Sequence, residues 1–143
     1  MDYDLQRFLK AQDAPYSGYA DALAEIRQGR KRSHWIWYVF PQMKGLGHSF
    51  NSEYYGISCR GEAEAYIGDV VLGARLREVA GALLAVEGRS AREILGGIDA
   101  LKVMSSMTLF DAVAPGDVFA AVLDKYYGGR RDARTLSMLD AEG

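Results

Sequence analysis

Residues 69–88 read D-V-V-L-G-A-R-L-R-E-V-A-G-A-L-L-A-V-E-G and carry the clearest structural pattern in the chain. Asp69 is suited to cap the N-terminus of a helix, and Gly88 to end it. Between them, apolar residues recur at steps of four and three, which places them in one stripe along a helix. The stripe consists of Leu72, Leu76, Val79, Leu83 and Val86.

Shorter helices are predicted on both sides of this stretch. The sequence S-A-R-E at residues 90–93 is a capping box that begins one of them. Connections of two to eight residues favour an all-α class, in the form of a compact single-domain bundle of about seven short helices over residues 1–143. Apolar residues at helical spacing predict the others around residues 5–9, 17–29, 62–67, 98–113, 118–126 and 132–139.

The composition is that of a globular domain. A chain of 143 residues is long enough to bury about two-thirds of its unfolded surface. Its 49% hydrophobic and 25% charged residues are ordinary values for a folded protein. Cys59 is the sole cysteine, which excludes an internal disulfide and fits a reducing compartment. We therefore expect a cytoplasmic protein.

Charge and motif content argue against several classes of partner. The formal net charge is −2, and Arg130, Arg131 and Arg134 form only a local basic cluster, so nucleic acid is not an expected partner. No apolar run reaches the roughly 18 residues of a membrane span. His34, His48 and Cys59 lack the close spacing of metal ligands. The sequence predicts no metal and no cofactor.

The segment from Arg30 to Tyr55 reads R-K-R-S-H-W-I-W-Y-V-F-P-Q-M-K-G-L-G-H-S-F-N-S-E-Y-Y. It holds both histidines and both tryptophans of the chain. Residues 33–40 are apolar almost throughout, so their periodicity leaves open a buried strand or a short buried helix, which Pro41 ends. Polar groups able to do chemistry are concentrated here, and the segment is the predicted location of a functional site.

His34 is the first candidate residue in this segment. A histidine titrates near neutrality and suits general acid–base catalysis. Trp35, Trp37 and Tyr38 are close in sequence and would supply rings on which a ligand stacks. The structural alternative is that His34 follows a capping serine and packs with a ring nitrogen on a carbonyl oxygen.

The sequence K-G-L-G-H-S at residues 44–49 is the second candidate. Gly45 and Gly47 allow backbone N–H groups to converge on an anion, to which Lys44, His48 and Ser49 would add donors. The spacing is not that of a Walker loop. A plain turn is the structural alternative.

Glu53 is the third candidate, because it lies beside Tyr54 and Tyr55. Desolvation by aromatic rings raises the pKa of a carboxyl group and suits it to acid–base catalysis. Cleavage of an N-glycosidic bond needs such a carboxylate near the sugar. The alternative is an exposed glutamate that is favoured by the helix dipole at the start of a helix.

Lys102, Ser105 and Ser106 share one face of the helix predicted at residues 98–113. A serine–lysine nucleophile pair is one interpretation. The other is that the serines allow close helix packing or bond to the loop of residues 30–55. Lys102 joins the predicted ligand-binding set if these two segments meet in space.

Four strings together resemble one family: S-H-W-I-W-Y-V-F-P-Q at 33–42, G-L-G-H-S at 45–49, E-A-E-A-Y at 62–66 and S-S-M-T-L-F at 105–110. It is an uncharacterised, largely bacterial family of domains of about this length, often labelled "calpastatin". The resemblance implies a single, mainly helical domain and no particular activity. Calpain inhibitors are disordered and polar, whereas this chain is neither.

A second, looser resemblance is to the NADAR domains. Residues 52–55, S-E-Y-Y, are similar to the S-E-H-Y motif of those domains, and L-K-V-M at 101–104 is similar to part of a second motif. NADAR domains are linked to ADP-ribose and N-glycoside chemistry. This resemblance implies a nucleotide-like ligand and a ribosyl bond as the place of any reaction.

Two hypotheses follow for the function. In the first, the protein binds a nucleotide- or ADP-ribose-like anion through the rings of Trp35, Trp37 or Tyr38, and any reaction would be hydrolysis of an N-glycosidic bond by His34 or Glu53. In the second, it is a non-enzymatic interaction module that presents an aromatic surface, built from both tryptophans and Phe40, to a protein partner. The sequence favours the first and leaves open whether a reaction takes place.

Overall fold

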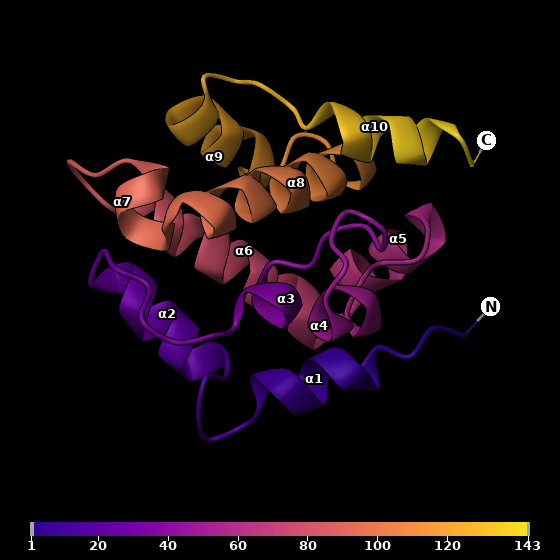
Figure 1. Cartoon of the computed structure of the whole chain (residues 1–143), viewed down its shortest axis with the longest axis horizontal. Helices are drawn as coiled ribbons and strands as arrows, with labels where there is room; N and C mark the ends of the chain where they lie inside the picture. Colours follow the sequence, from indigo (N-terminus) through magenta and orange to yellow (C-terminus); the bar gives the residue numbers. More distant parts are fainter. Residues whose placement is uncertain (1, 143) are drawn as a thin grey trace.

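Helices form the regular secondary structure of residues 2–142, which are the residues that this computed structural model describes (Figure 1). The predicted all-α class is confirmed. The described residues form ten helices rather than about seven, since short stretches such as 36–39 and 50–54 also complete helical turns. In chain order the helices are α1 (Gln6–Gln12), α2 (Tyr19–Arg27), α3 (Ile36–Val39), α4 (Phe50–Tyr54), α5 (Arg60–Gly68), α6 (Val70–Ala85), α7 (Ala91–Leu95), α8 (Gly97–Val113), α9 (Val118–Tyr127) and α10 (Ala133–Asp140).

The predicted long helix is α6, and its apolar stripe is the base of the core. The carboxylate of Asp69 caps the helix by accepting hydrogen bonds from the N–H groups of Val71 and Leu72. Helices α2, α5 and α9 pack around it. The four stripe residues inside the helix are buried, whereas Val86 follows the last turn and is only half-buried.

Helix α8 crosses the middle of the molecule, with α9 and α10 on one side and α3 on the other (Figure 1). All residues from Ser105 to Phe110 are buried. A helix that is buried all round needs neighbours on every face, and α8 contacts α3, α5, α7, α9 and α10. This arrangement brings Lys102 on α8 towards the aromatic segment.

The ambiguous segment at residues 33–40 contains the short helix α3, so the strand alternative is wrong. Glu25 of α2 fixes the entry to this helix. Its carboxylate accepts hydrogen bonds from the backbone N–H groups of Arg32 and Ser33, the Ser33 hydroxyl and Nε1 of Trp35. Burial opposes ionisation of the carboxyl group, but these hydrogen bonds outweigh it and lower the pKa of Glu25 to about 2.

Helix α4 lies within a loop whose two ends are paired. The N–H of Lys44 donates to the carbonyl of Ile57, and the N–H of Ile57 donates to the carbonyl of Gln42, each at 2.9 Å. These bonds form an isolated parallel bridge between Met43 and Ile57. The pairing closes residues 42–57 into one unit against α3.

The packing of α5 on α6 depends on a glycine. A Cβ atom on Gly73 would lie 2.2 Å from the carbonyl oxygen of Ile67, whereas a Cβ on Gly81, in the same helix, meets no atom within 4 Å. We expect Gly73→Ala to lower the free energy of unfolding by about 1–3 kcal/mol through overpacking. The matched control Gly81→Ala should raise it by up to about 1 kcal/mol. Urea unfolding followed by circular dichroism measures both, and changes of the same sign would contradict the interpretation.

The Glu25 carboxylate makes the stability depend on pH. Its pKa falls from 4.5 to about 2 on folding, so its contribution is complete above about pH 4.5 and is lost as the pH falls towards about 2. We expect Glu25→Gln to lower the free energy of unfolding at pH 7 and to flatten its decline between pH 5 and 2. Urea titrations across that range measure the slope. The control Glu64→Gln, at an exposed position of α5, should keep the wild-type slope; an unchanged slope in Glu25→Gln refutes the assignment.

Candidate functional site

A small cavity lies where α3, residues 42–56 and α8 meet. Its volume of about 10 Å³ is enough for one water molecule or one small polar group. The two segments that the sequence analysis singled out, residues 30–55 and 102–106, therefore meet in space. The residues that line this inner cavity are Ile36, Trp37, Phe40, Gln42, Asn51, Ser52, Tyr55, Gly56 and Lys102.

Trp37 and Lys102 form the polar centre of the inner cavity. The ammonium of Lys102 lies over the indole of Trp37, with Nζ 5.2 Å from the ring centroid. The indole Nε1 of Trp37 is buried, and no atom of residues 2–142 accepts a hydrogen bond from it. A buried donor without an acceptor costs about 1–3 kcal/mol. An acceptor bound at this point would remove that cost.

Asp99 orients two lysines, each of which lies over a tryptophan. Lys31 Nζ lies 3.0 Å from Asp99 Oδ2 and 5.0 Å from the ring centroid of Trp35. Lys102 Nζ lies 3.8 Å from Asp99 Oδ1, and its side chain is 24% exposed against 9% for Lys31. The carboxylate of Asp99 therefore neutralises the charge of Lys31 more than that of Lys102. The ammonium of Lys102 remains available to a ligand at the cavity.

An open groove adjoins the inner cavity and shares Gln42 and Lys102 with it. Its volume is about 280 Å³. One side comes from the loop around Leu46 and Gly47, and the other from the first turns of α8 and α10. The further lining residues are Ile98, Leu101, Ser105, Asp132 and Arg134.

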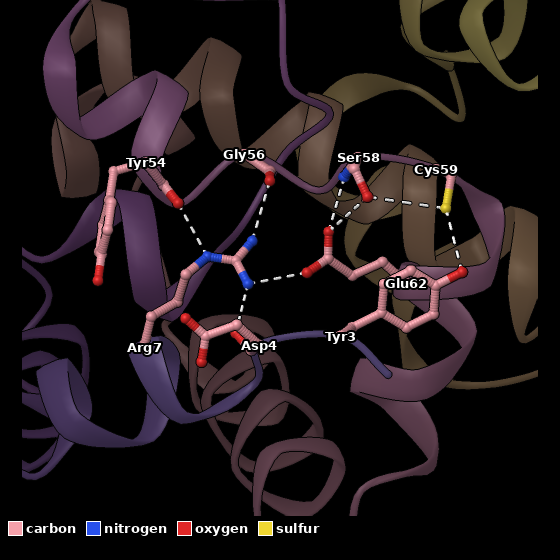
Figure 2. Close-up of polar contacts among 8 residues, drawn as sticks. All are labelled: Tyr3, Asp4, Arg7, Tyr54, Gly56, Ser58, Cys59 and Glu62. Atoms are coloured by element: carbon pink, nitrogen blue, oxygen red, sulfur yellow. Dashed lines mark hydrogen bonds and ion pairs between the residues drawn. The ribbon is translucent and has the colours of Figure 1, made fainter. Parts of the chain in front are cut away.

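Arg7 of α1 holds one wall of the inner cavity in place (Figure 2). Its guanidinium donates to the backbone carbonyls of Tyr54 at 2.8 Å and Gly56 at 3.0 Å. It also donates to the carbonyl of Asp4 and forms an ion pair of 2.8 Å with Glu62. Because the planar guanidinium binds four acceptors at once, it fixes the backbone on both sides of Tyr55.

Glu62 and Cys59 continue this network away from the cavity (Figure 2). The carboxylate of Glu62 accepts from the N–H and the hydroxyl of Ser58. Burial opposes its ionisation, but the hydrogen bonds of Arg7 and Ser58 lower the pKa of Glu62 below its usual range. A hydrogen bond with the hydroxyl of Tyr3 lowers the pKa of Cys59. The network anchors the turn that leads into α5.

Three of the predicted ligand-binding residues come together. Trp37 lines the inner cavity, Gly47 lines the groove, and Lys102 borders both. Ser49 contributes indirectly, since its hydroxyl caps α4 and lies 3.0 Å from the hydroxyl of Ser52, a lining residue.

The remaining predicted residues lie elsewhere. The side chains of His34, Lys44, His48 and Glu53 are exposed, and none of them lines the inner cavity or the groove. The two predicted catalytic residues, His34 and Glu53, are thus outside the candidate site. For Glu53, which lies in the first turn of α4, exposure fits the alternative of a glutamate at the start of a helix.

Three further residues of the predicted set have structural contacts. Trp35 is fully buried and donates to Glu25 at 3.0 Å, so it is not a free stacking surface. The hydroxyl of Tyr38 donates to the carbonyl of Ser17 at 2.6 Å. Gly45 adopts a positive φ of 102° in the turn after Lys44, which glycine tolerates without strain.

Several lining residues escaped the sequence analysis. Gln42 and Asn51 lie within the segment from Arg30 to Tyr55, so their position in the chain was the available indication. Arg134 was considered only as part of a local basic cluster. Arg7 gave no local signal at all, because its partner Glu62 is 55 residues away.

Two structural findings bear on other kinds of site. Within residues 2–142, no three His, Cys, Asp or Glu side chains are grouped as ligands for a metal ion. None of the helices in this range is long and apolar enough to cross a membrane.

The network of Figure 2 predicts that Arg7 cannot be replaced by another cation. Lysine keeps the charge but lacks the planar set of donors that reaches Tyr54, Gly56 and Glu62 together. We expect Arg7→Lys to lower the free energy of unfolding by about 2–3 kcal/mol, measured by urea denaturation. The control Arg30→Lys, at an exposed position, should change it by less than about 0.5 kcal/mol. Equal stabilities of the two variants would count against the role of Arg7.

Comparison with known proteins places this architecture in a family. No curated protein matches the sequence. The chain is similar in fold to the crystal structure of the conserved hypothetical protein Rv1873 from Mycobacterium tuberculosis, with a TM-score of 0.92 and 49% sequence identity over 96% of this chain and 97% of that one. The model of the family DUF1810, described as a protein of unknown function, matches residues 2–139. The chain therefore belongs to the DUF1810 family.

Proposed function

We propose that the protein binds a small anionic molecule at the inner cavity, through Trp37 and Lys102. The observation that carries this proposal is the buried Nε1 of Trp37, which has no acceptor among residues 2–142 although it belongs to a side chain that lines the cavity. The ammonium of Lys102 lies over the same indole ring. An anion supplies both the hydrogen-bond acceptor and the opposite charge.

The rest of the lining supports a ligand that accepts hydrogen bonds. The amides of Gln42 and Asn51 add donors, and the rings of Phe40 and Tyr55 add apolar walls. Apolar walls with a few converging polar groups are the usual composition of a small-molecule site. The inner cavity has no carboxylate in its lining, so a cation is disfavoured.

The likeness to NADAR domains makes nucleotides and ADP-ribose natural first probes. Hydrolysis of an N-glycosidic bond gains no support from the lining. It needs a carboxylate close to the sugar, whereas Glu53 is exposed outside both cavities and Asp132 of the groove is bonded to Thr135. We therefore propose binding and not turnover.

The aromatic-surface hypothesis is not favoured by the positions of its rings. Trp35 is 0% exposed and Phe40 is 1% exposed, so neither is available to a protein partner. Trp37 is the one member of the trio that is half-buried, and it faces the candidate site.

Indole N–H resonances in a ¹H–¹⁵N correlation spectrum test the proposal directly. The chain has two tryptophans, and among residues 2–142 only Trp35 has an acceptor for its indole N–H, the carboxylate of Glu25. Titration with ADP-ribose, NAD, sugar phosphates and inorganic phosphate should move the Trp37 indole signal while that of Trp35 stays fixed. Loss of the Trp37 signal in Trp37→Phe assigns the two resonances.

Matched variants show which lysine binds the anion. We expect Lys102→Met to weaken binding at least tenfold, and Trp37→Phe to weaken it about 10- to 150-fold, since one hydrogen bond to a charged group is lost. Lys44→Met removes a lysine of the neighbouring loop and should leave the affinity within twofold. If Lys44→Met abolishes binding and Lys102→Met does not, the site is the glycine loop and the proposal is wrong.

A further inference from the structure

The groove beside the inner cavity identifies the class of ligand more closely. We infer that the ligand is a small amphiphilic monoanion, with one acidic group and an apolar body the size of one ring or a short chain. This inference rests on the proposed function, because it places the acidic group at Trp37 and Lys102. It adds that the apolar body lies along α8, in the groove.

Exposed apolar side chains line the groove on the α8 side. Ile98 is 74% exposed and Leu101 is 66% exposed, although both are large aliphatic residues. Leu46 is half-buried on the opposite side. Adjacent exposed aliphatic side chains at the edge of a binding site are typical of a surface that a ligand covers.

The lining of the groove has a net positive charge, because it holds the two cations Lys102 and Arg134 against the one carboxylate of Asp132. Arg134 is exposed and forms no ion pair within residues 2–142. Asp132, the acidic residue of the groove, is occupied as the cap of α10, where it accepts from the N–H and the hydroxyl of Thr135. Two cations, Lys102 and Arg134, thus face an apolar groove, which is complementary to an apolar acid.

The dimensions limit the size of the ligand. The groove volume of about 280 Å³ lies at the lower end of the range of about 300–1,000 Å³ for small-molecule sites. The inner cavity accepts about one atom of water size. An oxygen of the acidic group fits there beside Trp37, while the groove takes the body. ADP-ribose, with an adenine base and two ribose units, is larger than the groove, so most of that molecule would lie outside it.

The groove is continuous with the inner cavity, which favours a ligand that has both an acidic group and an apolar body. Gln42 and Lys102 border both spaces, so one molecule reaches the polar centre and the aliphatic edge at the same time. A purely apolar molecule would leave the Trp37 donor and both cations without partners. A polyanion would leave Ile98 and Leu101 exposed to water.

A chain-length series tests the inference. We would titrate the protein with n-alkanoates from butanoate to octanoate and with n-alkanols of the same lengths, following the Trp37 indole signal. Each buried methylene contributes about 0.8 kcal/mol, so the affinity for alkanoates should rise up to about fourfold per carbon until the groove is filled. Alkanols should bind at least tenfold more weakly than the matched alkanoates, because they lack the charge.

Two variants separate the apolar and charged parts. Leu101→Asn should flatten the chain-length dependence, so that octanoate gains little over butanoate, whereas Val70→Asn, at an 88% exposed position of α6, should leave the series as in the wild type. Arg134→Gln should weaken alkanoates several-fold and leave alkanols unaffected. A series that is flat in the wild type overturns the inference.

The polyanion probes distinguish the two proposals. If ADP-ribose moves the Trp37 signal at a tenfold lower concentration than every alkanoate, the proposed function stands and the monoanion inference fails. If no probe of either kind moves that signal, both fail. A response to alkanoates that rises with length and disappears in Lys102→Met supports both.

Discussion

The buried ion pair between Arg7 and Glu62 is the constraint on which the candidate site depends. Both side chains are less than 10% exposed, so each charge has lost most of its hydration. Attraction alone rarely offsets that loss in a protein interior, and a buried pair survives only when further hydrogen bonds satisfy both groups. Here Ser58 and three backbone carbonyls do so. The pair therefore contributes geometry more than stability, since it joins α1 and α5 to the wall of the cavity.

Glu25 has the corresponding role on the other side of the cavity. Its carboxylate accepts hydrogen bonds from the backbone of residues 32–33 and from the indole of Trp35. These bonds fix the orientation in which α3 begins. The cavity wall on each side is thus a loop or a short helix. The guanidinium of Arg7 on α1 holds one side, and the carboxylate of Glu25 on α2 holds the other. Ligand-binding side chains keep their geometry when neighbouring hydrogen bonds lock the backbone that carries them. Trp37 is two residues after Trp35, whose indole donates to Glu25. The carbonyl of Gly56 accepts a hydrogen bond from Arg7.

Prediction from sequence succeeded where the relevant physics is local. The stripe of α6 and the capping box of α7 depend on residues three or four positions apart, so periodicity was sufficient for them. Residues 33–40 were ambiguous because a segment that is apolar almost throughout has no polar face from which a period can be measured. Trp37 and Lys102 were found from residue type alone. The exposed positions of His34 and Glu53, outside the two cavities, could not be predicted because exposure depends on tertiary packing, and Arg7 was missed because its partners are distant in the chain.

The selectivity of the site follows from its excess of donors. Lys102 is 24% exposed and shares Asp99 with Lys31, so its charge is partly compensated and partly solvated, and it attracts anions with little discrimination. The indole N–H of Trp37 differs, because it is buried and has a fixed direction. A site with a buried donor rejects a molecule that lacks the matching acceptor far more strongly than it rejects one that merely lacks a methylene. In the proposed site, charge would therefore bring anions to the groove, whereas the Trp37 donor would decide which of them stays bound.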